Sequence, residues 1–178
     1  DWSSDVCSSD LEAIHRYIKE PEAIVANVDG DDWLKNNQTV DLIQNIYEKT
    51  NCLLTYGGST VGSINNPTGQ RYHPIIETKN HYRQDHFRPN HLRTWKAGLF
   101  KKIKQKQFFD PTGKWLRFNE DLAIMLPMLE LAGGNYQVIS QSLYHYNQDT
   151  LLSDNKINLQ EKLLEEVYLR KQPALKKQ

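Results

Sequence analysis

The sequence predicts an α/β fold, because short apolar runs alternate with stretches of helical periodicity. Residues 23–28 are predicted to form a short buried strand, residues 37–49 an amphipathic helix, and residues 52–56 a second strand that ends at a Gly-Gly pair. A strand, a helix and a strand in this order are the unit of a parallel sheet. With 178 residues, the chain is long enough for one domain with a sizeable core.

The helix at residues 37–49 has the clearest pattern in the first half of the chain. Val40, Ile43 and Tyr47 recur at helical intervals, with Ile46 beside them, so one face is expected to cover the sheet. Asn36 or Asn37 can cap the first turn. An earlier helix at residues 12–18 has weaker spacing and should end before Pro21.

The second half continues the alternation of helices and strands. Residues 59–90 show no sustained periodicity and are predicted to be a long loop, which in a compact domain is usually functional. A helix is predicted from residue 93 to residue 104, with a basic outer face. Further on we expect a helix at residues 119–132 capped by Asn119, strands at 136–139 and 142–146, and a last helix at 155–171.

The first eleven residues are expected to be foreign to this domain. Residues 1–11 correspond to a common sequencing-library adapter translated in frame, so we leave them out of the fold prediction. The remaining chain, residues 12–178, is then treated as one unit. Different codons in the source DNA would contradict this interpretation.

Composition narrows the class of protein. The chain has 22 basic and 22 acidic residues, and leaving out the three aspartates of residues 1–11 gives a small positive excess of about three. This balance does not favour a nucleic-acid partner. Cys52 is the only cysteine outside the adapter-like segment, which is typical of a reducing compartment. No apolar run is long enough for a transmembrane segment. We therefore expect a cytoplasmic protein, free or bound peripherally at the inner membrane face.

An acidic cluster follows the first predicted strand directly. Asp29, Asp31 and Asp32 lie within four residues, and Gly30 allows a sharp turn between the first two. Carboxylates this close repel one another, and a cation such as Mg²⁺ or Mn²⁺ would neutralise them. A solvated acidic turn explains the same spacing, since Asp-Gly is a common turn dipeptide. From these residues alone, both interpretations remain open.

Three separated stretches resemble family 2 glycosyltransferases of the GT-A fold. Residues 28–34 (VDGDDWL) resemble their DxD stretch, residues 91–103 (HLRTWKAGLFKKI) their acceptor-side helix, and residues 118–123 (FNEDLA) the Glu-Asp motif that carries the catalytic base. Residues 143–147 (LYHYN) resemble a strand that often follows in bacterial members. The stretches also occur in the expected order, so the set is more specific than any one of them.

The resemblance implies a Rossmann-like fold, with a mixed sheet flanked by helices, and a nucleotide-diphosphate sugar as donor. The acceptor would be a hydroxyl of a glycan or another molecule. Mn²⁺ or Mg²⁺ would be held by Asp31 and Asp29, with His145 as a further candidate ligand. The residues expected at the donor are Asp29, Gly30, Asp31, Asp32 and Arg93.

The catalytic residues implied by the resemblance are Asp121 and its neighbour Glu120. Asp121 would accept the proton of the acceptor hydroxyl as it attacks the anomeric carbon, with inversion. Acidic residues in the first turn of a helix also occur simply because they complement the helix dipole. The Gln-x-x-Arg-Trp motif of processive synthases is missing, so we expect a non-processive enzyme.

The family's opening strands have no counterpart in this sequence. We therefore expect residues 12–178 to be the C-terminal part of a single GT-A domain that lacks the first half of its sheet, and to be inactive in this form. Two alternatives are a phosphatase of the haloacid-dehalogenase type, which also has Asp-x-Asp after a strand, and a remnant with no catalytic activity.

Overall fold

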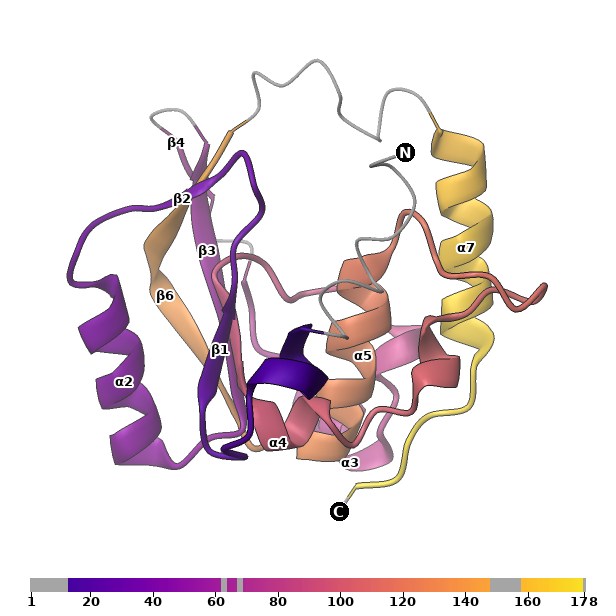
Figure 1. Cartoon of the computed structure of the whole chain (residues 1–178), viewed down its shortest axis with the longest axis horizontal. Helices are drawn as coiled ribbons and strands as arrows, with labels where there is room; N and C mark the ends of the chain where they lie inside the picture. Colours follow the sequence, from indigo (N-terminus) through magenta and orange to yellow (C-terminus); the bar gives the residue numbers. More distant parts are fainter. Residues whose placement is uncertain (1–12, 62–63, 67–68, 148–157, 178) are drawn as a thin grey trace.

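The computed structural model describes residues 13–61, 64–66, 69–147 and 158–177, and within them six strands form one sheet with helices on both faces (Figure 1). Residues 1–11 lie outside this part. The strand order is β1 (Ile24–Asn27), β5 (Arg93–Lys96), β3 (Leu54–Val61), β6 (Tyr136–Tyr146) and β2 (Trp33–Leu34), and β4 (Ile64–Asn66) pairs with β3 outside this order.

The sheet is mixed, and the α/β prediction is confirmed at this level. Strand β5 runs antiparallel to both β1 and β3, whereas β3 and β6 are parallel. Strands β1 and β3 therefore point the same way, as a strand–helix–strand unit requires, but β5 lies between them. Strand β2 is antiparallel to β6, and β4 is antiparallel to β3.

Strand β1 differs from the prediction of a buried strand. It stands at the end of the strand order, with β5 as its neighbour, and the side chains of Ile24 and Val28 are 38% and 40% exposed. Only Val25 packs against the main core. An apolar run therefore identified the strand but not its position, because an edge strand can carry exposed β-branched residues.

The prediction of a helix at residues 93–104 is wrong. Residues 93–96 form the inner strand β5, and only α4 (Ala97–Phe100) is helical before the short turn η2 (Gln105–Phe108). Every side chain of β5 is buried. Trp95 is the single apolar residue of β5, and its spacing of three to Leu92 and four to Leu99 imitated a helix although Leu92 precedes the strand and Leu99 lies in α4. Lys96 belongs to no basic outer face, because its Nζ lies 2.7 Å from Glu22 and 2.8 Å from the Asn51 side-chain oxygen.

Two other strands are longer than predicted. Strand β3 continues through Gly57 and Gly58, and β6 is one strand of 11 residues rather than two. A Cβ atom at Gly57 would lie 3.0 Å from the Ile139 carbonyl oxygen, so glycine permits the close approach of β3 to β6. The register between these strands shifts after Gly57, which marks an irregularity in the ladder.

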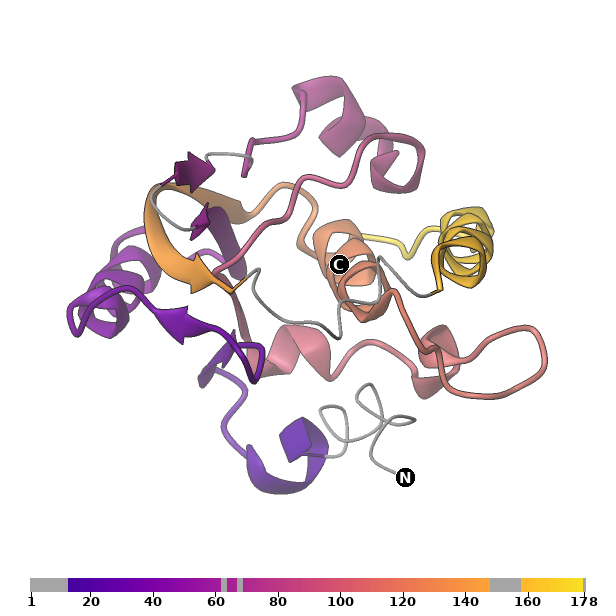
Figure 2. The same cartoon turned by 90° about the horizontal axis from the view of Figure 1, so that it is seen from above.

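Helices cover the two faces of the sheet. Helix α2 (Thr39–Thr50) packs on one face through Ile43 and Tyr47, which meet Ile139 and Leu143 of β6 in a small core. Helix α5 (Glu120–Ala132) packs on the other face and forms the larger core, and α7 (Leu159–Lys171) lies outside α5 (Figures 1 and 2). The segment predicted as a loop contains α3 (Pro74–Lys79) and η1 (Tyr82–Gln84).

The helix ends match the predictions more closely. Helix α5 has the expected bounds, contains Pro127, and ends at Gly133 with a positive φ of 55°. Asn119 precedes α5 but makes no capping hydrogen bond with its side chain. Residues 13–17 are helical, and α7 begins at Leu159 instead of residue 155. Residues 155–157 lie outside the described residues.

Candidate active site

A small cleft lies where β1, β5 and α5 meet. Asn27 at the end of β1 pairs with Arg93 at the start of β5, and the first turn of α5 faces this pair. The cleft has a volume of about 20 Å³ and is lined by Asn27, Asp29, Arg93, Trp95, Glu120, Asp121, Ile124 and Met125. The fold thus brings together four of the predicted site residues, from three distant stretches of sequence.

The acidic residues after β1 form a tight turn held by β6. The backbone N–H of Asp32 donates to the Asp29 carbonyl oxygen at 3.0 Å. The backbone N–H of Asp29 donates to the Tyr144 hydroxyl at 3.0 Å, and the Asn147 N–H donates to the Asp32 carboxylate at 2.8 Å. Asp31 is exposed, and a Cβ atom at Gly30 would meet no atom within 4 Å. The turn is therefore fixed on the side of Tyr144 and Asn147 and open to solvent at Gly30 and Asp31.

Asp29 is a carboxyl of the cleft whose pKa is raised. Burial and, after it, the charge of Asp121 raise its pKa to about 6, with smaller contributions from Asp32 and Asp31, although Arg93 acts in the opposite direction. Asp29 thus senses Asp121 across the cleft as well as its own neighbours. A cation bound here would remove this repulsion, which is the property expected of a metal site.

Asp121 is paired with Arg93 across the cleft. The Arg93 Nη2 donates to the Asp121 Oδ2 at 2.8 Å. Burial has the largest single effect and raises the pKa of the Asp121 carboxyl. The charge and hydrogen bond of Arg93, together with His91 and Lys162, outweigh burial, so the pKa lies below its usual range. The Asp121 side chain is 48% exposed, whereas that of Arg93 is only 5% exposed. Asp121 therefore remains open to solvent on one side while a buried guanidinium orients it.

His91 lies between Tyr144 and Asp29, and it was not predicted as a site residue. Its ring stacks on Tyr144 with centroids 4.6 Å apart, and its Nε2 is 3.7 Å from the Asp29 Oδ2. Burial, together with Arg93, lowers the His91 pKa to about 3, so the ring is neutral at pH 7. The only sequence signal was its place at the start of the stretch that resembles the acceptor-side helix.

His145, the third predicted metal ligand, lies against Trp33. It pairs with Trp33 across β6 and β2, and the two rings stack with centroids 4.2 Å apart. Among the residues that the structure describes, no three His, Cys, Asp or Glu side chains are grouped to hold a metal ion by themselves. The metal ligands Asp29, Asp31 and His145 remain predictions.

Sequence comparison does not identify a family: no protein-family model and no curated protein matches the chain. Among solved structures, S. aureus TarS 1–349 matches with a TM-score of 0.49 and 14% identity, over 76% of this chain and 38% of that one. Its complexes with UDP-GlcNAc and with UDP match with TM-scores of 0.47 and 0.45, at 14% and 13% identity, over 71% and 83% of this chain.

The chain spans less than two fifths of the length of these structures. At this level of similarity they establish neither its family nor its activity. The described residues also contain no helix that is both long and apolar enough to cross a membrane.

Proposed function

We propose that this cleft belongs to an inverting, non-processive glycosyltransferase of the family 2 type with a GT-A fold, which moves a sugar from a nucleotide-diphosphate donor to an acceptor hydroxyl. The observation that carries the proposal is the meeting of the acidic turn and the Asp121 carboxylate in one cleft, although 92 positions separate Asp29 from Asp121. A sugar transferase needs both parts: a site that neutralises the departing diphosphate and a base for the acceptor.

The acidic turn suits a divalent cation that is shared with the donor. Asp29 and Asp31 would hold Mn²⁺ or Mg²⁺, with Asp32 supporting the turn through its bond to the Asn147 N–H. Such ions are commonly bound by one or two carboxylates together with substrate phosphates, so a complete protein cage is not required. The electrostatics of Asp29 support the assignment, because the charges of Asp121, Asp32 and Asp31 add to burial in raising its pKa, and a bound cation would offset them. Once bound, the cation would stabilise the charge that develops on the leaving diphosphate.

Asp121 is the residue best placed to accept a proton. Its exposed side faces the cleft, and the fixed contact with Arg93 holds the carboxylate in one orientation. The lowered pKa keeps it ionised at pH 7, ready to bind the acceptor hydroxyl. Glu120 lines the same cleft beside it. The Arg93 Nε has no hydrogen-bond partner among the described residues, so an oxygen of the bound nucleotide sugar could accept its N–H.

The proposal is tested by release of nucleoside diphosphate from UDP-sugars in the presence of Mn²⁺, measured on this chain and on the longest product of its gene. We expect activity in the longer protein and none in the chain of 178 residues. Asp31→Ala and Asp121→Asn should each lower the rate by at least about 100-fold, because each removes a main contribution to transition-state stabilisation. Glu48→Gln, a change at an exposed carboxylate on α2 that lines neither the cleft nor the groove between α2 and β6, should leave the rate unchanged.

The assay separates the alternatives. Release of inorganic phosphate from a phosphomonoester, without release of nucleoside diphosphate, would instead support the phosphatase. A longer protein that is inactive on every UDP-, GDP- and dTDP-sugar tested, while remaining folded, would favour the remnant.

A further inference from the structure

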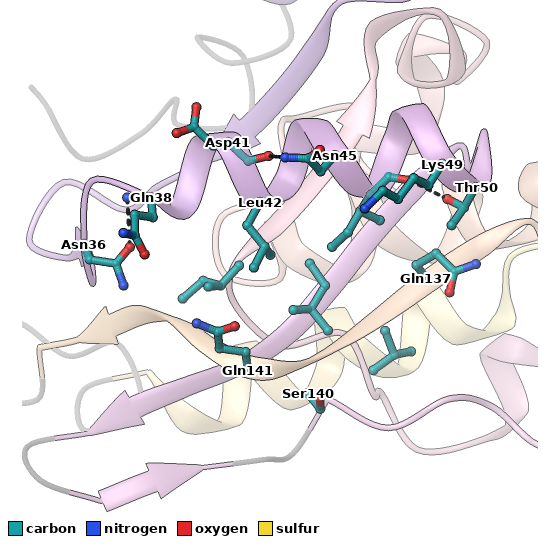
Figure 3. A pocket seen from close by; sticks show the side chains of 14 residues that line it. Asn36, Gln38, Asp41, Leu42, Asn45, Lys49, Thr50, Gln137, Ser140 and Gln141 are labelled. Atoms are coloured by element: carbon teal, nitrogen blue, oxygen red, sulfur yellow. Dashed lines mark hydrogen bonds between the residues drawn. The ribbon is translucent and has the colours of Figure 1, made fainter.

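A second and much larger cavity lies on the opposite side of the sheet from α5. It is a groove of about 820 Å³ between α2 and β6, and none of its lining residues lines the candidate active site. Figure 3 shows α2 along one side of the groove, β6 along the other, and Leu42 pointing between them. Its volume lies within the range of known small-molecule sites.

The groove has an apolar floor because both elements place aliphatic side chains there. Residues two apart on a strand share one face, and Gln137, Ile139, Gln141 and Leu143 of β6 all line the groove; Val138 and Ser140 between them line it as well. Ile139 and Leu143 are buried in the small core. Leu42 and Ile46 of α2, one turn apart, pack against that core from the other side.

Amide side chains surround this floor. Asn36 and Gln38 lie at one end of the groove, Gln141 beside its middle, and Gln137 at the other end (Figure 3). The Asn36 side-chain oxygen accepts from the Gln38 backbone N–H at 3.0 Å, so the Asn36 side chain is already held in place. In the described part of the chain, the side chains of Gln38, Gln137 and Gln141 have no hydrogen-bond partner. Their donors and acceptors are free for a ligand.

As far as the structure describes the chain, the lining has no net charge and no aromatic ring. Its charged residues among those described are Asp41 and Lys49, which have opposite signs. A phosphate or carboxylate ligand would find no surplus of positive charge, and a nucleobase would find no ring on which to stack. An uncharged ligand rich in hydroxyl groups fits better, because each amide offers donors and an acceptor side by side, as neighbouring hydroxyls do.

We propose that this groove binds a neutral oligosaccharide. The C–H faces of the sugar rings would lie on the partly buried side chains of Leu42 and Ile46, and their hydroxyls would meet the amides of Gln38, Gln137 and Gln141. This site is separate from the proposed transferase cleft and does not depend on it. Binding can therefore be measured whether or not the protein transfers a sugar.

The test is an NMR titration of the ¹⁵N-labelled chain with neutral tetrasaccharides of glucose and of N-acetylglucosamine, and with a tetrasaccharide of uronic acid. One of the neutral probes should shift the backbone signals of residues 137–143 and the side-chain amides of Gln38 and Gln141. The double variant Gln38→Ala/Gln141→Ala should weaken binding about tenfold or more, as the loss of two hydrogen bonds predicts. Gln44→Ala, which removes an exposed α2 amide outside the groove, is the matched control and should bind normally.

A second variant keeps the test valid if the double alanine variant is poorly folded. Gln141→Arg changes an exposed side chain and should block the groove without disturbing the core. The proposal is overturned if no neutral probe shifts the groove signals at millimolar concentration. It is also overturned if the uronic acid probe binds as tightly as the neutral ones, or if Gln44→Ala weakens binding as much as the groove variants.

Discussion

At the scale of single residues, the cleft is a set of charges that are only partly compensated. Arg93 is buried and faces Asp121, while Asp29 lies near the carboxylates of Asp121, Asp32 and Asp31, and burial together with these charges raises its pKa to about 6. His91 supplies no positive charge, because burial and Arg93 lower its pKa to about 3. The residues around Asp29 therefore favour the arrival of a cation from solution.

The neutral state of His91 predicts a specific pH dependence of stability. An unfolded histidine has a pKa near 6.5, whereas that of His91 in the folded chain is about 3. Between these values the unfolded state binds more protons, so the free energy of unfolding should decrease as the pH falls, by up to about 1.4 kcal/mol per pH unit. His91→Gln should remove this contribution. Urea denaturation of both proteins from pH 7 to pH 4 measures the difference.

Asp29 titrates in the same range with the opposite sign. Its pKa is raised from 3.8 to about 6, so its contribution to stability is present below pH 3.8 and lost as the pH rises through 6. Because both proteins retain Asp29, the difference between their slopes reports His91. Equal slopes for the two proteins would show that His91 is not buried in the neutral form.

At the scale of elements, a side chain of α7 holds the segment that precedes α5. The Glu165 carboxylate accepts hydrogen bonds from the backbone N–H groups of Arg117, Phe118 and Asn119 at 2.7, 3.0 and 2.8 Å. The Asn119 side chain also donates to Glu165 and to the Lys162 carbonyl oxygen. A residue 44 positions after Asp121 thus fixes the segment that leads into the turn carrying Asp121.

Glu165→Ala should therefore destabilise the protein by about 2 kcal/mol, since it removes the acceptor of several buried or half-buried N–H groups. Hydrogen exchange at the amides of Arg117, Phe118 and Asn119 should become faster at the same time. Glu161→Ala changes an exposed carboxylate on the same helix and is the control. If both variants lose equal stability and residues 117–119 stay protected, Glu165 does not hold this segment.

Elements with strong local signals could be predicted from the sequence. The spacing of Ile43 and Tyr47 predicted α2, and the acidic first turn with Gly133 predicted the bounds of α5. Strand β5 could not be predicted, because its burial depends on β1 and β3 packing on either side of it.

Asp29, Arg93 and Asp121 were all predicted as site residues, but not the ion pair between the last two. His91 was missed because its burial arises only in the folded sheet.

At the scale of the whole molecule, one buried ion pair connects four segments. Arg83 of η1 contacts Glu130 of α5 at 2.5 and 3.0 Å, and both side chains are almost fully buried. Arg83 also donates to the Leu169 carbonyl oxygen of α7 at 2.7 Å, and the Leu175 N–H donates to Glu130 at 2.8 Å. The Arg83–Glu130 pair thus connects η1, α7 and the segment at Leu175 to helix α5 of the core.

Arg83→Met should cost about 3–5 kcal/mol in unfolding free energy, because it leaves the Glu130 carboxylate buried without a cation. The double variant Arg83→Met/Glu130→Leu should recover much of the loss, since no buried charge remains. Arg117→Met, which breaks an exposed pair of 3.9 Å, should cost less than about 1 kcal/mol. A single variant at Arg83 that costs no more than Arg117→Met would contradict this role.

Binding of a divalent cation by the turn at residues 29–32, facing Asp121, is tested most directly by paramagnetic broadening with Mn²⁺. With Mn²⁺ and UDP added to the ¹⁵N-labelled protein, we expect the amide signals of residues 29–32 and 121 to broaden first. Asp31→Asn should abolish this broadening, whereas Glu48→Gln, at an exposed carboxylate of α2, should preserve it. Broadening that centres on another part of the chain, or that persists unchanged in Asp31→Asn, would contradict the account.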